Sequence, residues 1–266
     1  MAEGLERLAE VVWEREGAVV TLILNRPERR NAITTTMLAE LLWCVETCAG
    51  DDHVRALVIR GNGKGFCPGD ELRGMGELPA DFPFRPQARL SHAALQSALQ
   101  GMPKPTVAAI HGFAFGVGLD LAMACDFRIA TDDAEVRDQR VFERGMHAVT
   151  GCAWFQPRAL GLTRALEFLI LGTPYSGREA AAAGMVTMSV APEELDTAVH
   201  DFAERLASAP TRAIGLMKRQ IYTGLTMTHD EFMAFAAPLT KEVTIEDRQE
   251  GIQAFLEKRP ARFTGR

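Results

Sequence analysis

The chain has 266 residues, enough for one large domain or for a domain with a small appendage. Hydrophobic residues make up 47% and charged residues 24%, which is ordinary for a water-soluble protein with a substantial core. The net charge of −6 and the pI of about 5.6 disfavour a nucleic-acid binder, because neutralising phosphates needs a basic surface. An anionic small ligand needs only a local group of Lys and Arg, so that class stays open.

The cysteines and the apolar runs bear on the compartment. None of the five cysteines belongs to a CxxC pair or to a Cys/His cluster with zinc-site spacing. An odd number without such a framework indicates a reducing compartment. Residues 1–10 lack the apolar stretch of a signal peptide, and the apolar run from Val107 to Ala124 is interrupted by His111 and Asp120. We therefore expect a cytoplasmic protein with no membrane span and no bound metal.

The first half of the chain predicts short strands that alternate with glycine-rich turns and helices. The expected strands are 11–15, 19–24, 54–59, 106–110 and 127–130, and the expected helices are 34–49 and 90–99, with a short one after Gly118. Because the order of strand, glycine loop and helix recurs, we predict stacked parallel strands in a repeating α/β core.

The second half is expected to be helical from about Trp154 onward. Ser176 and Glu179 form a capping box of the kind that begins a helix. No linker or low-complexity segment divides the chain. We therefore predict a core domain over residues 1–195 and a helical C-terminal region over residues 196–266.

Two glycine-rich loops carry the candidate chemistry. One runs from Gly63 to Leu72 and the other from His111 to Asp120, and each follows a buried strand and opens into a predicted helix. Glycine lets the backbone approach a ligand closely, and a helix start leaves N–H groups without partners. Two such starts next to each other would form an oxyanion hole, although glycine content alone favours the plainer interpretation of tight turns. Neither loop fits the nucleotide-binding GxGxxG or P-loop pattern.

Five segments, in order along the chain, resemble the enoyl-CoA hydratase/isomerase (crotonase) family. They are Asn25–Ala32, Gly65–Leu72, Pro105–Asp126, Arg178–Val186 and Asp247–Phe263. The resemblance implies an α/β fold in which repeated strand-strand-helix units form a crotonase-like spiral core, with a helical C-terminal trimerisation region. It also implies an enzyme that acts on an acyl-coenzyme A thioester. Coenzyme A is then part of the substrate, and no tightly bound cofactor is expected.

In the family, two backbone N–H groups hold the thioester oxygen. The resemblance places these donors at Asp70 and Val117, where family members commonly have small residues. Removing one donor of this kind typically costs on the order of 3 kcal/mol of transition-state stabilisation. Backbone donation survives a change of side chain, but Val117 is expected to narrow the acyl pocket. The Asp70 carboxylate either points away or disfavours an enolate.

The proton-transfer groups match the family less well. Asp120 occupies the position of a catalytic Glu in hydratases and of an Asp in dienoyl-CoA isomerases, and it reaches about 1.5 Å less than Glu. The second family carboxylate falls at Arg140 by one count along the chain and at Val141 by another. Glu143 or Asp138 would have to take that role, and we predict Asp120 and Glu143 as the catalytic pair. A helix-capping Asp120 and a solvated ion pair at Glu143 are the plainer alternatives.

The expected partners are an acyl-CoA and further copies of the chain. The predicted contacts to coenzyme A or the acyl group are Arg29, Arg30, Ala32, Leu72, Lys258 and Phe263. The two arginines match a basic position near the phosphates. The last two residues match tail residues that, in the family, reach coenzyme A on a neighbouring subunit, so a homotrimer or a dimer of trimers is expected. The Pro- and Phe-rich segment from Gly76 to Leu90 is expected to line or cover the acyl pocket.

Three functions follow from the resemblance, and hydrolysis of a thioester or of a C–C bond ranks behind the first two. Hydration of a 2-enoyl-CoA is favoured, because it is the commonest reaction of the family. Double-bond isomerisation of an enoyl- or dienoyl-CoA is the close alternative, because the second glutamate is missing. A catalytically impaired homologue that only binds acyl-CoA is the alternative from another class.

Overall fold

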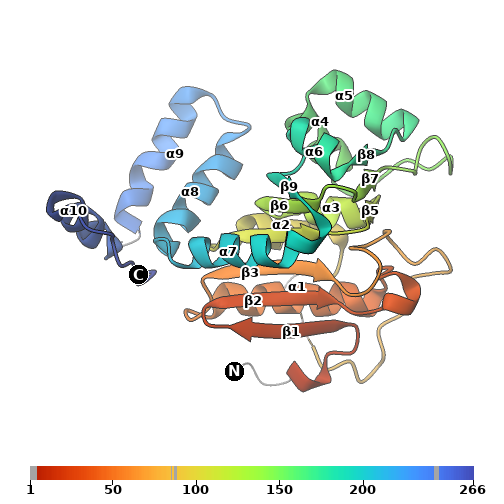
Figure 1. Cartoon of the computed structure of the whole chain (residues 1–266), viewed down its shortest axis with the longest axis horizontal. Helices are drawn as coiled ribbons and strands as arrows, with labels where there is room; N and C mark the ends of the chain where they lie inside the picture. The colour runs from red at the N-terminus through yellow and green to blue at the C-terminus, as the bar shows by residue number, and fades with distance from the viewer. Residues whose placement is uncertain (1–4, 85, 87–88, 243–245) are drawn as a thin grey trace.

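The computed structural model describes residues 5–84, 86, 89–242 and 246–266. Its main sheet has six strands in the order β1-β2-β3-β4-β6-β9, and every neighbouring pair except β1 and β2 is parallel (Figure 1). The strands are β1 (Val11–Glu16), β2 (Val19–Leu24), β3 (Ala56–Gly61), β4 (Thr106–Ile110), β6 (Phe127–Thr131) and β9 (Met188–Val190).

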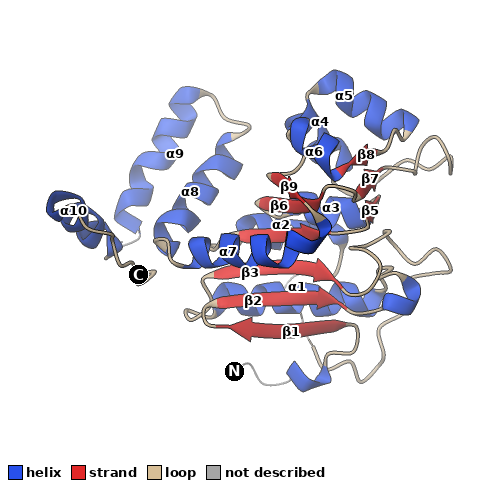
Figure 2. Cartoon of the chain, viewed as in Figure 1, coloured by secondary structure: helices blue, strands red, loops and turns tan. Residues whose placement is uncertain are grey.

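A second, three-stranded sheet lies beyond the carboxyl ends of the main parallel strands (Figure 2). It contains β5 (Phe113–Phe115), β7 (Glu135–Arg137) and β8 (Tyr175–Ser176). Strand β5 follows β4 after only two residues and pairs with β7 in parallel. The glycine-rich loop predicted after β4 therefore contains a short strand, and the pairing of this strand with β7 fixes the direction of the loop.

The main sheet is buried on both faces. Along β3, Leu57 and Ile59 pack into the larger core with helix α1 (Thr35–Gly50), whereas Ala56 and Val58 pack with helix α7 (Leu195–Ala207). This alternation follows from the two-residue period of a strand, and two-sided burial explains why the predicted strands are continuous apolar runs. Helix α7 belongs to the region predicted to follow the core, and it packs directly on the core sheet. The domain boundary at residue 195 stays a prediction.

The other helices complete the architecture. They are α2 (His92–Gly101), α3 (Val117–Ala124), α4 (Cys152–Leu160), α5 (Leu162–Leu166), α6 (Gly177–Ala182), α8 (Thr211–Gly224), α9 (His229–Glu242) and α10 (Asp247–Glu257). Short 3-10 turns lie at Leu5–Arg7, Pro27–Arg29 and Pro192–Glu194, and a π-helical turn at Glu167–Leu171. Helices α8 to α10, blue in Figure 1, extend away from the second sheet.

The predictions for the first half are confirmed within about two residues at each end, and the capping box of Ser176 and Glu179 begins α6. The prediction of a wholly helical second half is wrong, because β8 and β9 lie within it. These strands have two and three residues. Hydrophobic periodicity is not detectable over so few positions, and the strands exist only because β7 and β6 pair with them.

The segment expected to cover the acyl pocket packs elsewhere. Phe82 and Phe84 are buried, and the ring of Phe84 lies 4.5 Å from that of Trp43 on α1, measured between centroids. None of the described residues from 76 to 90 lines the candidate site defined below. Their aromatic content therefore extends the hydrophobic core.

Asn31 holds the first glycine-rich loop in place. Its backbone is left-handed, with φ 66°, and its side chain is buried. The amide nitrogen donates to the carbonyl oxygens of Asn62 and Gly65 at 2.8 and 3.0 Å, while the amide oxygen accepts from the N–H of Arg26. Asparagine tolerates this conformation better than most residues, so one residue provides both the turn and the hydrogen bonds.

We predict that Asn31→Ala lowers the free energy of unfolding by on the order of 3 kcal/mol, because it leaves buried carbonyls unpaired and strains a left-handed backbone. Urea denaturation followed by circular dichroism measures this change. Asn62→Ala is the control, since its exposed amide bonds only Asn25. An equal loss in both variants would contradict the proposed role of Asn31.

Candidate functional site

The two glycine-rich loops are joined by backbone hydrogen bonds. The N–H of Cys67 donates to the oxygen of Phe113 at 3.2 Å, and the N–H of Phe115 donates to the oxygen of Cys67 at 2.9 Å. This parallel bridge between Cys67 and Ala114 ties the first loop to β5. Gly116 in turn donates to Arg137 on β7. Both loops therefore have a fixed relative position at the carboxyl ends of β3 and β4.

Two glycines allow the close approach of these loops. A side chain at Gly118 would lie 2.3 Å from the oxygen of Cys67, which no Cβ atom tolerates. Gly69 has φ 104°, and a side chain there would lie 3.4 Å from the backbone nitrogen of Val117. The residue after Gly69 is Asp70, so the two predicted donors, Asp70 and Val117, come from segments in contact.

Both predicted backbone donors lack a hydrogen-bond acceptor among the described residues. Val117 is the first residue of α3, where the N–H has no partner within the helix. Around Asp70, the oxygen of Gly69 accepts from Ile33 and the N–H of Glu71 donates to Ile33, so the N–H of Asp70 is directed away from that pairing. Within the described part of the chain, no hydrogen bond is found from either N–H group.

The Asp70 carboxylate has a cationic neighbour when His92 is protonated. Its Oδ1 lies 3.1 Å from Nε2 of His92 at the start of α2, without hydrogen-bond geometry. The Asp70 side chain is 31% exposed and the His92 side chain 18%. The two alternatives predicted for this carboxylate, pointing away or disfavouring an enolate, both stay predictions.

A cavity of about 110 Å³ lies between the two loops. It is lined by Pro68, Gly69, Asp70, Leu72, Gly116, Val117, Arg140, Arg144, Met146, His147, Ala148, Val149 and Thr150. Asp70 and Val117, the residues of both predicted backbone donors, thus line one cavity, together with Leu72 from the predicted contacts. The segment after β7 supplies the opposite wall.

Asp120 lies one helical turn after Val117 and is 0% exposed. Its Oδ2 accepts hydrogen bonds from Nη1 of Arg140 at 3.0 Å and from Oγ1 of Thr150 at 2.6 Å. Its Oδ1 is buried and has no partner among the described residues. Burial raises the pKa of Asp120, and Arg140 and Thr150 act in the opposite direction. A buried carboxylate with one unpaired oxygen is a candidate for proton transfer.

Arg140 joins Asp120 to a second buried carboxylate. Its Nε donates to Oδ1 of Asp138 at 2.9 Å, and its Nη2 forms an ion pair with Oδ2 of the same residue. Burial disfavours the charge of Arg140, but the hydrogen bonds to Asp138 and the two negative charges raise its pKa overall. Arg140 is one of the two positions counted for the second family carboxylate, and a guanidinium that stays charged cannot exchange protons.

Glu143 is not brought together with Asp120. It is exposed and forms an ion pair with Arg137 on β7, and it does not line the cavity. This matches the solvated pair that the sequence offered as the alternative. Asp138 is committed to Arg140. Among the described residues, the carboxylates at the cavity are Asp70 in its wall and Asp120 directly behind Arg140 and Thr150.

The predicted coenzyme A contacts fall into two groups. Arg29 and Arg30 are exposed beside the buried Ala32, in the turn that precedes the first loop. Lys258 and Phe263 follow α10, far from β5 and α3 in Figure 1. The carbonyl of Phe263 accepts from Arg55 at the start of β3. A single copy of the chain therefore does not bring the tail residues to the cavity.

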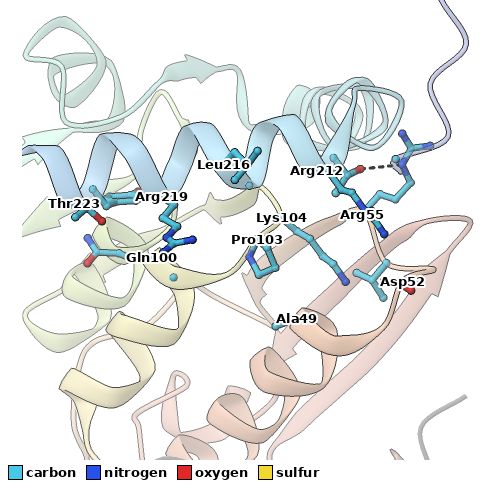
Figure 3. Close-up of a pocket in the computed structure, with 16 residues that line it drawn as sticks. Ala49, Asp52, Arg55, Gln100, Pro103, Lys104, Arg212, Leu216, Arg219 and Thr223 are labelled. Atoms are coloured by element: carbon cyan, nitrogen blue, oxygen red, sulfur yellow. Dashed lines mark hydrogen bonds between the residues drawn. The ribbon is translucent and has the colours of Figure 1, made fainter. Parts of the chain in front are cut away.

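A larger cavity, of about 420 Å³, lies at the other end of the strands (Figure 3). Helix α8 and the ends of α1 and α2 surround it. Its cations hold backbone carbonyls: Lys104 donates to Cys48 and Asp51 at 2.5 Å, and Arg55 donates to Ala209 at 2.7 Å. They thereby cap helix ends and loops. This cavity adjoins the segments that precede β3 and β4, whereas the unpaired N–H groups follow them.

Among the described residues, no group of three or more His, Cys, Asp or Glu side chains is arranged to hold a metal ion. In the same part of the chain, no helix combines the length and apolarity needed to cross a membrane.

Sequence reasoning missed Thr150 and the partnership of Asp138 with Arg140. Asp138 and Arg140 are two residues apart, and this spacing does not predict a side-chain contact in a segment that is neither helix nor strand. Thr150 is preceded by an exposed loop and lies 30 residues from Asp120, so only the packing of α4 on α3 brings the two together.

Comparison with known proteins assigns the family. The enoyl-CoA hydratase/isomerase family profile matches residues 14–266. The chain is 34% identical to 1,2-epoxyphenylacetyl-CoA isomerase of Escherichia coli, covering 94% of this chain and 97% of that protein. It is also 34% identical to crotonyl-CoA hydratase of Syntrophomonas wolfei, covering 95% and 97%.

Solved structures agree with the sequence comparison. An enoyl-CoA hydratase subunit from Geobacillus kaustophilus superposes with a TM-score of 0.85 at 32% identity, covering 97% of this chain and 99% of that one. An enoyl-CoA hydratase from Mycobacterium smegmatis gives 0.84 at 30% identity, covering 96% and 99%. The fold is thus the predicted crotonase fold, and the chain belongs to the enoyl-CoA hydratase/isomerase family.

Proposed function

We propose that the chain acts on an acyl-CoA thioester whose carbonyl oxygen accepts hydrogen bonds from the N–H groups of Asp70 and Val117. The observation that carries this proposal is the pair of unpaired N–H groups that border one cavity, next to a buried carboxylate. Donors held in place before the reaction stabilise a developing enolate without reorganisation. Negative charge near the start of α3 is favoured further by the helix dipole.

Asp120 is the proton-transfer group of this proposal. Val117 and Asp120 are three residues apart on α3 and therefore lie on one face of the helix. A thioester oxygen held at Val117 places the acyl α and γ carbons on the same side of the helix as Asp120. The unpaired Oδ1 of Asp120 is the oxygen available to take a proton.

Double-bond isomerisation is the reaction that this arrangement favours. Moving a double bond requires one group that removes a proton from one carbon and returns it to another. Adding water requires in addition a group that binds and activates the water. Of the two positions counted for that group, one holds Arg140, which is tied to two carboxylates and exchanges no proton, and the other holds Val141, which has no titratable side chain.

Hydration of a 2-enoyl-CoA, favoured from the sequence, is the second candidate. Relatives named crotonyl-CoA hydratase and probable enoyl-CoA hydratase support it, and one named 1,2-epoxyphenylacetyl-CoA isomerase supports the first. In a hydratase, His147 at the cavity wall is a group available to hold the water.

Coenzyme A is proposed to lie between two copies of the chain. Its phosphates contact Arg29 and Arg30 of one copy, and Lys258 and Phe263 of another copy reach the nucleotide. Exposed apolar residues on α8 and α10 support such an assembly: Met217, Ile221, Ile252, Phe255 and Leu256. The proposed assembly is a trimer or a dimer of trimers.

Asp120→Asn is expected to lower kcat with an enoyl-CoA by at least about 10²-fold while leaving thioester binding intact, because the amide keeps the shape but takes no proton. Steady-state kinetics and calorimetric titration measure the two quantities. The control is Asp132→Asn, whose carboxylate pairs with Arg178 at the surface. Undiminished turnover would remove Asp120 from the mechanism.

A panel of acyl-CoA thioesters distinguishes the three functions. We expect thermal stabilisation by enoyl-CoAs, since ligands that bind only the folded state raise the melting temperature, and conversion of a 3-enoyl- into a 2-enoyl-CoA by chromatography. Formation of a 3-hydroxyacyl-CoA would instead support hydration. Stabilisation without any product would support a non-catalytic binder.

Lys258→Ala is expected to raise KM for the CoA thioester with little change in kcat, because a contact to the nucleotide is made equally in ground and transition states. The same acyl group on pantetheine, which lacks the nucleotide, is the matched substrate control. A rise in KM with both substrates would contradict a nucleotide contact.

A further inference from the structure

One cation is buried between two carboxylates beside the cavity. Asp120, Asp138 and Arg140 are 0%, 2% and 6% exposed. Arg140 lines the cavity itself, and its stem lies against Gly116, the residue before α3. Two buried negative charges share one positive charge, so the group carries a net charge of −1 when both carboxylates are ionised.

Hydrogen bonds fix the guanidinium in this position. Of its five N–H donors, Nε and one N–H of Nη2 are used by Asp138. The two of Nη1 are used by Asp120 and by Thr150, at 3.0 and 2.5 Å. The backbone N–H of Arg140 also donates to Asp138, at 3.0 Å. A side chain held by four of its five donors has one orientation.

We propose that Arg140 and Asp138 are positioning residues that hold Asp120 by Oδ2 and leave Oδ1 as the atom that transfers the proton. The inference rests on the proposed function, since it assigns a role in the transfer by Asp120. Thr150 donates a further hydrogen bond to the same Oδ2. In this arrangement the carboxylate cannot rotate to present either oxygen, so the proton is taken and returned at one place.

The same groups set the ionisation of Asp120. Burial raises its pKa, the charge and hydrogen bond of Arg140 and the hydroxyl of Thr150 lower it, and the charge of Asp138 raises it. Among the described residues, Asp70, Arg144 and His147 also line the cavity, and Cys152 on α4 is a further titratable group near Asp120. Burial, together with Asp120, raises the pKa of its thiol to about 11, so it is uncharged at neutral pH. Arg140 and Asp138 therefore act on Asp120 in opposite directions.

Because Arg140 and Asp138 change the pKa of Asp120 in opposite directions, removing each charge is expected to shift the pH profile of activity in opposite directions. Asp120 must be ionised to accept a proton, so kcat/KM falls as the pH drops through the pKa of this group. Arg140→Gln removes a positive charge and raises that pKa, so the acidic limb of the pH profile moves to higher pH. Asp138→Asn removes a negative charge and lowers the pKa, so the limb moves to lower pH. A purely structural role predicts lower activity with no such pair of shifts.

The experiment measures kcat/KM against pH for the full-length protein and these variants, with circular dichroism to confirm folding. Arg140→Lys keeps the positive charge but lacks the planar set of guanidinium N–H donors. It is expected to leave the limb near the wild-type position while kcat falls by ~10–100-fold through misplacement of the carboxylate. Thr150→Val removes a hydrogen bond and no charge, and it is expected to move the limb upward. Arg178→Gln, at the exposed pair with Asp132, is the control.

The outcomes separate this inference from the proposed function. Shifts of opposite sign in Arg140→Gln and Asp138→Asn support it. An active wild type whose limb moves in the same direction in both variants, or in neither, overturns it and leaves the proposed function standing. A wild type that binds thioesters and turns over none overturns the proposed function itself. If Arg140→Gln fails to fold, the upward shift of the acidic limb in Thr150→Val and the downward shift in Asp138→Asn provide the test.

Discussion

The backbone pairing of Cys67 with β5 is the interaction on which the site depends. It joins two loops that belong to different units of the core and are about 45 residues apart in sequence. Without it, the N–H groups of Asp70 and Val117 would belong to independent turns. With it, the position of one follows from that of the other. Gly118 is needed because a Cβ there would clash with Cys67, and Gly69 because its backbone has φ 104°.

The parallel sheet explains why this meeting point exists. The carboxyl ends of β3 and β4 are adjacent because the strands pair in register, and the chain leaves both strands on the same side. Residues that precede the strands are used differently. There, Lys104 and Arg55 satisfy the carbonyls of helix ends and loops, so buried cations at that end stabilise the fold.

The sequence predicts what depends on local pattern. Strand β4 is recognisable as five buried apolar or small residues between a proline and a glycine turn, and Val117 is recognisable as a helix start after glycine. What depends on contacts between distant segments is not predictable in this way. One count placed Arg140 and another placed Val141 at the second carboxylate position, but the pairing of Arg140 with Asp120 joins residues twenty apart, and Glu143 is held by Arg137 instead. Phe82 and Phe84 illustrate the same limit, because aromatic content does not say which surface a loop packs against.

The net charge of the buried group has a consequence for the energetics of proton abstraction. In the proposed mechanism, a proton leaves a neutral thioester and reaches Asp120. The carboxylate becomes neutral, and the enolate takes up the negative charge. The total charge of the site is then −1 before and after the step, and only its location changes, by about one helical turn. The buried group itself thus changes from −1 to neutral, and the negative charge passes to the thioester oxygen, where the N–H groups of Asp70 and Val117 are proposed to receive it without reorganisation.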